Sequence, residues 1–258
     1  MSRIAVIGLD GRPLSREAAG LLEGAALVAG GRRHLRDLAV EPGRAVFFEG
    51  DLSAALSRIE TENRPVAVLA SGDPGFFGIV RLLGERFGNL ELRVLPAVSS
   101  VALAFARAGV SWDDAVTVSA HGREPRRAVN VCQAHPKVAV LTSPGFGPAE
   151  LAGALEGLGR TFVVAEGLGG PDERVVRGDA GSVAGGRWED PNVVLVLDEG
   201  RASGRGWISS GYESPRRWAL PEDEFEHRSG MITKGSTRAL VLSRLGPGPG
   251  DLVWDVGA

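Results

Sequence analysis

The chain has 258 residues, of which 43% are hydrophobic and 24% charged. This is the composition of a globular protein with a core of its own, and it excludes a disordered chain. Lys and Arg number 29 against 32 Asp and Glu, a net charge of −3. With no basic surplus, no nucleic-acid partner is expected. The single cysteine, Cys132, excludes a disulfide framework and a cysteine-rich zinc module, so no metal is expected and its thiol is assigned to a core.

No stretch approaches the roughly 18 consecutive apolar residues of a membrane span. The N-terminus runs into the apolar segment Ile4-Ala5-Val6-Ile7 without a signal-peptide pattern. The sequence therefore predicts a cytoplasmic protein with no membrane partner.

Short apolar runs alternate with amphipathic stretches along most of the chain. The runs predict strands over residues 4–7, 45–48, 66–70, 92–95, 115–119, 138–141, 161–165, 174–177, 193–197 and 252–256. Helices are expected over residues 16–26, 52–61, 101–108, 148–157 and 233–245, several of them behind a Ser or Asp cap. This alternation is typical of an α/β fold with largely parallel sheets.

Composition shifts suggest a division of the chain. Four predicted strands precede residue 112 and five lie between 112 and 198, which indicates two small α/β domains, 1–111 and 112–198. A Gly-, Ser- and Arg-rich linker follows over 199–212. Residues 213–258 hold too little structure for an independent core.

Three loops at the ends of predicted strands are candidates for ligand binding. The first is Gly8-Leu9-Asp10-Gly11-Arg12-Pro13, which lacks the Gly-x-Gly-x-x-Gly and Gly-Lys-Ser/Thr patterns of nucleotide-binding loops. It is either a ligand loop at a strand's carboxyl end or a plain turn between strand and helix.

The second loop is Ser71-Gly72-Asp73-Pro74-Gly75-Phe76-Phe77-Gly78. Its small residues would let a ligand reach backbone amides, Asp73 could accept hydrogen bonds, and Phe76 and Phe77 could form an apolar wall. The alternative is an Asp-Pro turn with both phenylalanines in the core.

The third loop carries the adjacent serines Ser99 and Ser100 at a predicted helix start. Such serines cap the helix, or they offer hydroxyls and free amides to a ligand carboxylate. From these residues alone both readings stay open.

Taken together, the motif blocks resemble the tetrapyrrole methylases. The resemblance is carried by these three loops in order, by Ser119-Ala120-His121-Gly122-Arg123, and by Val164-Ala165-Glu166-Gly167-Leu168-Gly169-Gly170-Pro171. It covers about residues 1 to 200, and within the family it is nearest to the branch that methylates precorrin-6Y, or its cobalt counterpart, at C-5 in cobalamin biosynthesis. The first loop departs from the Gly-x-Gly-Pro-Gly of many members, which weakens residue transfer there.

The resemblance implies an S-adenosylmethionine-dependent methyltransferase with its cofactor in a cleft between two α/β domains. The cofactor-binding residues carried over are Gly8, Asp10, Ser71, Gly72, Asp73, Phe76, Ser99, Ser100, Thr142, Gly167 and Leu168. An anionic tetrapyrrole would be bound by Arg12, His121 and Arg123, because guanidinium groups suit carboxylates. The catalytic residue is not identified by the motifs, and a homodimer is implied.

The tail also resembles a known domain. Leu220-Pro221-Glu222-Asp223-Glu224-Phe225 and Leu252-Val253-Trp254-Asp255-Val256-Gly257-Ala258 are similar to the start of a second, decarboxylating methyltransferase domain. We therefore expect a chain that is normally fused to that domain.

Three alternatives remain at this stage. A methylase of the same fold could act on ribosomal RNA or on diphthine, although the charge of −3 offers no basic face. The chain could be a non-catalytic S-adenosylmethionine-binding module. A nucleotide-binding Rossmann domain is disfavoured by the first loop.

Overall fold

The computed structural model describes residues 2–48, 52–120, 124–200, 219, 222, 232–248 and 251–256. The chain divides into two compact units. The N-terminal unit comprises Met1–Val110 with Ala165–Val175 and Glu189–Val193. The C-terminal unit comprises Ser111–Val164, Val176–Trp188 and Val194–Ala258.

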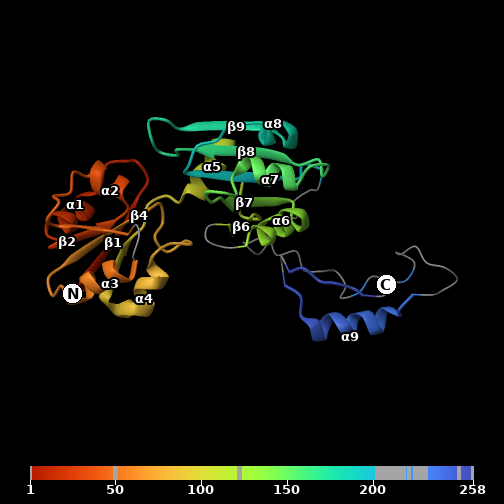
Figure 1. Ribbon diagram of the computed structural model, residues 1–258, viewed down its shortest axis with the longest axis horizontal. Coiled ribbons are helices and arrows are strands. Elements are labelled where there is room, and N and C mark those ends of the chain that lie inside the picture. The colour runs from red at the N-terminus through yellow and green to blue at the C-terminus, as the bar shows by residue number, and fades with distance from the viewer. Residues whose placement is uncertain are drawn as a thin grey trace. The chain divides into compact units, whose positions relative to one another are not determined.

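The N-terminal unit is built on a five-stranded sheet of order β3-β2-β4-β1-β5 (Figure 1). Its strands are β1 Ile4–Leu9, β2 Leu27–Gly30, β3 Ala45–Phe47, β4 Val66–Ser71 and β5 Leu92–Leu95. Every neighbouring pair in it is parallel, so all five carboxyl ends lie at one edge. The helices of this unit are α1 Arg16–Glu23, α2 Arg32–Asp37, α3 Leu52–Thr61, α4 Val80–Phe87 and α5 Ser100–Ala108, with a 3-10 turn η1 at Asn89–Glu91.

Both faces of this sheet are buried, which explains its continuous apolar runs. Ile4 and Val6 of β1 pack toward a cluster that includes Ile59 of α3 and Leu83 of α4. Ile7 packs on the opposite face, in a cluster that holds residues of α1 and α2. Figure 1 shows these helix pairs on opposite sides of the strands.

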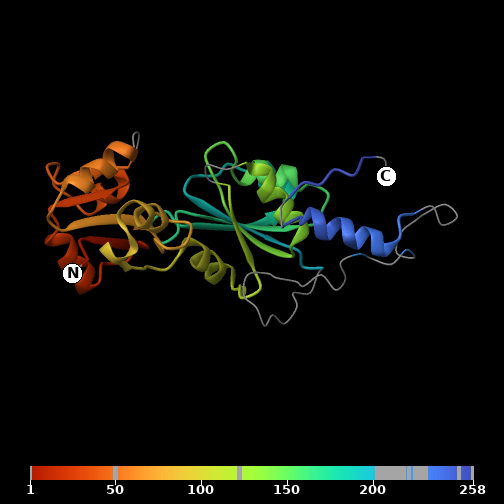
Figure 2. The ribbon, with the colours of Figure 1, turned by 90° about the horizontal axis from the view of Figure 1, so that it is seen from below.

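The second sheet has the order β6-β7-β10-β8-β9. Its strands are β6 Val116–Ser119, β7 Lys137–Leu141, β8 Thr161–Glu166, β9 Arg174–Asp179 and β10 Asn192–Leu197, and its helices are α6 Pro125–Ala134, α7 Pro148–Ala154 and α8 Ala180–Ala184. In Figure 2 the green helices lie on one side of the green and teal strands. Cys132 is fully buried in this core and its burial raises the thiol pKa to about 12, as the assignment to a core requires.

The mixed α/β class with two sheets is confirmed, with several local corrections. The helix predicted over 16–26 ends at Glu23, and the strand β2 that follows it was missed, as was α2. The strand predicted over 252–256 is wrong: residues 251–256 form none, and Trp254 is 81% exposed. An isolated apolar run without a partner for its backbone hydrogen bonds does not make a strand.

The helix predicted at 233–245 is α9, Gly235–Leu245. Within the described residues, none of the helices is both long and apolar enough to cross a bilayer.

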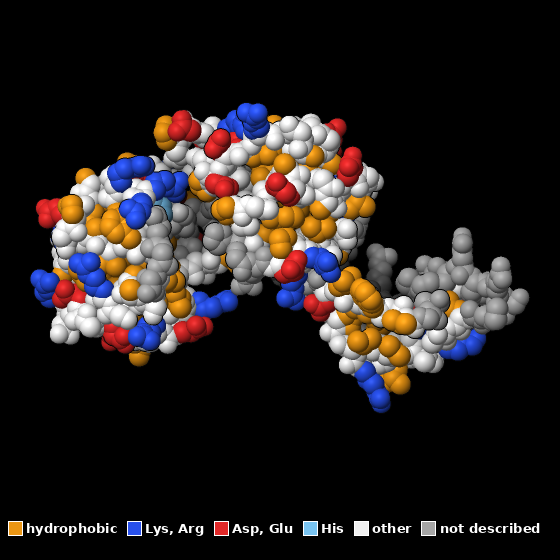
Figure 3. All heavy atoms as spheres, in the orientation of Figure 1, with side chains coloured by type: hydrophobic (Ala, Val, Ile, Leu, Met, Phe, Trp, Pro, Cys, Tyr) orange, Lys and Arg blue, Asp and Glu red, His pale blue; other side chains and the backbone are white. Residues whose placement is uncertain are grey.

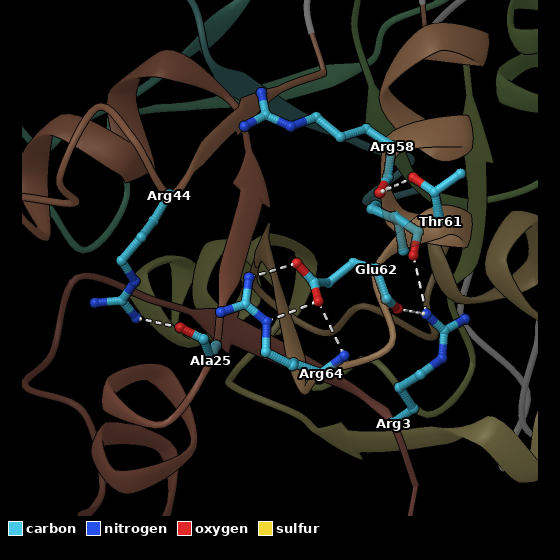
Figure 4. A network of polar contacts seen from close by, with 8 residues as sticks. Arg3, Ala25, Arg44, Arg58, Thr61, Glu62 and Arg64 are labelled. Atoms are coloured by element: carbon cyan, nitrogen blue, oxygen red, sulfur yellow. Dashed lines mark hydrogen bonds and ion pairs between the residues drawn. The ribbon is translucent and has the colours of Figure 1, made fainter.

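Two arginines close helix ends at the amino edge of the first sheet (Figure 4). Arg3 donates to the carbonyls of Ile59 and Glu62 at the end of α3. Arg44 donates to Leu22 O in the last turn of α1 and to Ala25 O just beyond it, each at 2.7 Å. These bonds supply donors to carbonyls at helix ends, where the regular helical hydrogen-bond pattern stops. A cleft of about 330 Å³ lies here, lined by Arg58, Glu62 and Arg64 among others, at the opposite edge from the strands' carboxyl ends.

We expect Arg44→Ala to lower the free energy of unfolding by about 1–3 kcal/mol, because it removes part-buried hydrogen bonds to the carbonyls of Leu22 and Ala25. Urea denaturation measures the change. The matched control is Arg36→Ala, which breaks an exposed ion pair with Asp37 and should cost under about 0.5 kcal/mol. Equal losses in the two variants would contradict the capping role.

Candidate functional site

The first two candidate loops approach each other at the carboxyl edge of the N-terminal sheet. The Gly72 amide donates to Leu9 O at 2.6 Å. A Cβ atom on Gly8 would lie 2.2 Å from Gly72 O and 2.6 Å from Ala97 N. Since these contacts are with backbone, only glycine allows the strand end at residue 8 to lie so close to its neighbours.

The third loop joins the same cluster. Gly72 has a φ of +60°, and a Cβ there would lie 3.1 Å from Ser99 Cα and 3.3 Å from Ser100 N. Ser99 Oγ accepts from Ala102 N at 3.1 Å, so Ser99 is the N-cap of α5. The capping reading is thus confirmed for the Ser99 side chain, while Ser100 occupies the first position of the helix.

Asp10 connects the first loop to the third by a hydrogen bond. Its carboxylate accepts from the Arg12 amide at 3.2 Å, from the Arg12 guanidinium, and from Val98 N at 3.3 Å. The Asp10 side chain is 7% exposed, whereas that of Arg12 is 68% exposed. Hydrogen bonds from Arg12 lower the pKa of Asp10 below its usual 3.8, so the group is a carboxylate at neutral pH.

In the second loop the Asp-Pro turn is present. Asp73 Oδ1 accepts from Gly75 N at 2.8 Å and Asp73 O from Phe76 N at 3.1 Å. The two phenylalanines pack edge to face with ring centroids 5.0 Å apart, yet Phe76 is 37% and Phe77 52% exposed. They are therefore not core residues, and they offer an apolar surface beside the loop.

A fourth segment, the glycine-rich loop after β8, lies against the first loop. A Cβ on Gly11 would lie 1.9 Å from Gly169 O, and one on Gly169 would lie 2.1 Å from Asp10 O. Glu173 holds this loop by accepting from Gly169 N at 2.8 Å and from the guanidinium of Arg107 on α5. Gly167 and Leu168 precede Gly169 in this loop, and their role in cofactor binding stays a prediction.

Four further residues were predicted to belong to the site: Arg12, His121, Arg123 and Thr142. Thr142 follows β7 in the C-terminal unit and is 9% exposed. His121 and Arg123 lie outside the described residues. Arg12 is exposed beside its partner Asp10.

Two features were missed from sequence. His34 of α2 lies 3.1 Å from Ser71 Oγ, and the Arg107–Glu173 pair supports the loop at Gly169. Recognising β2 would have placed His34 at the carboxyl edge, because β2 pairs with β4. No sequence signal links residues 107 and 173.

The loop cluster suits a small ligand with polar groups. It offers the start of α5, left-handed glycines at 11, 72 and 169, and backbone approaches that a Cβ would block. S-adenosylmethionine, with its amino, carboxylate and hydroxyl groups, fits such a cradle of backbone and carboxylate partners. We found no metal-binding group of three or more His, Cys, Asp or Glu side chains among the described residues.

The fold and loop cluster define an α/β protein with a candidate ligand site at the carboxyl edge of a parallel sheet. Comparison with known protein families identifies the family to which the chain belongs. The family model of the tetrapyrrole (corrin/porphyrin) methylases matches residues 7–184, and the chain belongs to this family. A second model, a precorrin methyltransferase domain, matches residues 223–258.

Two curated relatives match the chain, one of them longer than it and the other shorter. A precorrin-6Y C(5,15)-methyltransferase (decarboxylating) from Sinorhizobium sp is 40% identical over 97% of this chain, which spans only 60% of that relative. A cobalt-precorrin-7 C(5)-methyltransferase from Salmonella typhimurium is 34% identical over 77% of this chain and is covered over its whole length.

Solved structures of methyltransferases have a similar fold. A precorrin-6Y methylase of cobalamin biosynthesis from Archaeoglobus fulgidus superposes with a TM-score of 0.60 at 25% identity, covering 77% of this chain and all of that one. A uroporphyrin-III C-methyltransferase from Thermus thermophilus, solved with S-adenosylhomocysteine, gives 0.56 at 23% identity, over 76% and 97% of the two chains. The latter likeness supports the fold alone.

Proposed function

We propose that this chain transfers a methyl group from S-adenosylmethionine to C-5 of precorrin-6Y or its cobalt counterpart in cobalamin biosynthesis. The observation that carries the proposal is the 34% identity along the whole of a cobalt-precorrin-7 C(5)-methyltransferase. It is supported by the loops of the resemblance, which gather at one edge of the N-terminal sheet.

When bound, S-adenosylmethionine supplies an electrophilic methyl group on a sulfonium. The chain's part is to orient the reactants and to exclude water. Asp10 holds the first and third loops together through the Val98 amide, and the Asp73 turn fixes the second loop. Glu173 fixes the fourth. The cofactor would thus meet preformed backbone, with Ser71, Ser100, Gly167 and Leu168 in or beside the loop cluster. Thr142 is proposed as a further cofactor contact on the resemblance alone.

The macrocycle carries acetate and propionate arms, so it needs cations. We assign Arg12, His121 and Arg123 to these arms, because a guanidinium binds carboxylates in a bidentate manner. The exposed guanidinium of Arg12 is available to such an arm on its outer side.

The assembly and location are also part of the proposal. The Sinorhizobium relative is longer than this chain, and residues 223–258 match a precorrin methyltransferase domain, which supports fusion to such a domain. We further propose a cytoplasmic homodimer.

Calorimetry tests the binding step. S-adenosylhomocysteine should bind, whereas NAD and ATP should not. Incubation with labelled methyl donor and precorrin-6Y should then place the label at C-5. Tight NAD binding without S-adenosylhomocysteine binding would falsify the methylase assignment, and label on RNA or on a protein would redirect it to another substrate class.

A further inference from the structure

A histidine outside the motif loops meets the second loop at the carboxyl edge of the N-terminal sheet. His34 lies on α2, the helix that follows β2, and its Nε2 is 3.1 Å from Ser71 Oγ at the end of β4. Ser71 is exposed and His34 is half-buried. Ser71 ends β4 and begins the second loop, so the pair lies at the start of that loop. Figure 3 shows several Lys and Arg side chains, in blue, on this face of the N-terminal unit.

The neighbours of the imidazole decide which nitrogen carries the proton. Arg33 Nη2 lies 3.4 Å from the same Nε2, and a guanidinium can only donate. Nε2 is therefore an acceptor, and the ring proton sits on Nδ1, which is buried without a hydrogen-bond partner. With the ring proton on Nδ1, the Ser71 hydroxyl is the donor in its 3.1 Å contact with Nε2.

The surroundings keep this histidine neutral. Burial is the main cause that lowers the pKa of His34 below 6.5, and the charge of Arg33 lowers it further, while Asp37 opposes them. Those two charged groups lie on its own helix, and β4 contributes only the uncharged Ser71. A neutral imidazole beside a hydroxyl can take up a proton.

On the basis of the proposed function, we infer that His34 and Ser71 form the relay that receives the proton released by the methylated macrocycle. As the ring carbon forms its bond to the methyl group, the carbon–sulfur bond breaks and its electron pair stays on sulfur. The macrocycle then carries the positive charge and loses a proton to Ser71 Oγ, while the Ser71 proton passes to His34 Nε2. The products of the step are a thioether, a neutral methylated ring and the imidazolium of His34. His34 acts through Ser71 and is thus a positioning residue that also stores the proton.

His34→Gln is the sharpest variant, because its amide oxygen can accept from Ser71 but cannot take up a proton. We expect kcat for methyl transfer to precorrin-6Y to fall about 100-fold, with the dissociation constant of S-adenosylhomocysteine changed less than about threefold. The wild-type profile of kcat against pH should decline below the His34 pKa, under 6.5, and the variant should lack that decline. Adding Ser71→Ala to His34→Gln should lower kcat little further, because the two act as one unit. His135→Gln, in the C-terminal unit, is the control.

Nitrogen-15 NMR gives a readout independent of turnover. The His34 ring should be neutral at pH 7 with its proton on Nδ1. A charged ring at pH 7, or a His34→Gln enzyme with wild-type kcat and pH profile, overturns the relay while leaving the proposed function intact. A loss of S-adenosylhomocysteine binding or of folding in His34→Gln without a changed pH profile assigns His34 a structural role and also overturns it. A wild-type chain that binds no S-adenosylhomocysteine overturns the proposed function, and the relay with it.

Discussion

Gly8→Ala is expected to abolish tight binding of S-adenosylhomocysteine and to cost about 3 kcal/mol of unfolding free energy. The added methyl group would lie 2.2 Å from Gly72 O and 2.6 Å from Ala97 N. Both neighbours are backbone atoms in loops that are themselves tied down, so no side-chain rotation relieves the overlap. The first, second and third loops would have to move apart, and the ligand site would open with them.

The matched control is Gly20→Ala in α1. Gly20 is exposed, and a Cβ atom there meets nothing within 4 Å. Alanine favours a helix interior over glycine by about 1 kcal/mol, so this variant should be neutral or slightly more stable and should bind S-adenosylhomocysteine normally. Calorimetry and urea denaturation measure both properties. Wild-type affinity in Gly8→Ala would show that the close approach of the loops is not required for binding.

How far the sequence predicted the fold depended on the length of each element. Runs such as Val193-Val194-Leu195-Val196-Leu197 are long enough to indicate a strand buried on both faces, and the structure has β10 there. The four residues of β2 come directly after Ala25 and Ala26, which extend the helical pattern of the sequence beyond α1. The six residues of α2 include three arginines, so neither element has a period that can be recognised. The run at 252–256 shows the opposite error, since apolar residues indicate a strand only where another strand pairs with them.

The site was predictable where chemistry is local in sequence. Asp10, Asp73 and Ser99 occur in loops whose glycines and caps mark the ends of strands, and the structure places these loops together. Contacts between segments that are distant in the sequence have no comparable sequence signal. His34 reaches Ser71 across 37 residues and Arg107 reaches Glu173 across 66. The first pairing follows from the contact of β2 with β4 in the sheet rather than from spacing.

Asp10→Ala is expected to weaken S-adenosylhomocysteine binding by about 10- to 100-fold, which corresponds to about 1.5–3 kcal/mol for hydrogen bonds to a charged group. The carboxylate is the only partner shown for Val98 N in the described structure, and it also accepts from the Arg12 amide. Its removal frees the first loop from the third and leaves a partly buried amide without an acceptor. Calorimetry measures the loss.

Arg12→Gln tests whether the ion pair of Asp10 with Arg12 or its hydrogen bond with Val98 N matters for binding. The Arg12 guanidinium is largely exposed, so its loss should weaken binding by less than about fivefold, because exposed ion pairs contribute about 1 kcal/mol or less. The bond between Asp10 and Val98 N remains in this variant. If both variants lost the same affinity, the ion pair rather than the loop contact would be the source.

The pH dependence gives an independent check on Asp10. Hydrogen bonds from Arg12 lower the pKa of the folded-state carboxyl below 3.8, its value in the absence of these partners. The carboxylate therefore stabilises the folded chain fully above about pH 5, and this stabilisation is lost as the pH falls through the lowered pKa. The difference in unfolding free energy between wild type and Asp10→Ala should be constant from pH 7 to pH 5 and should shrink below pH 4. A difference that instead grew on acidification would mean that Asp10 is protonated in the folded state, and the contact with Val98 could not then be that of a carboxylate.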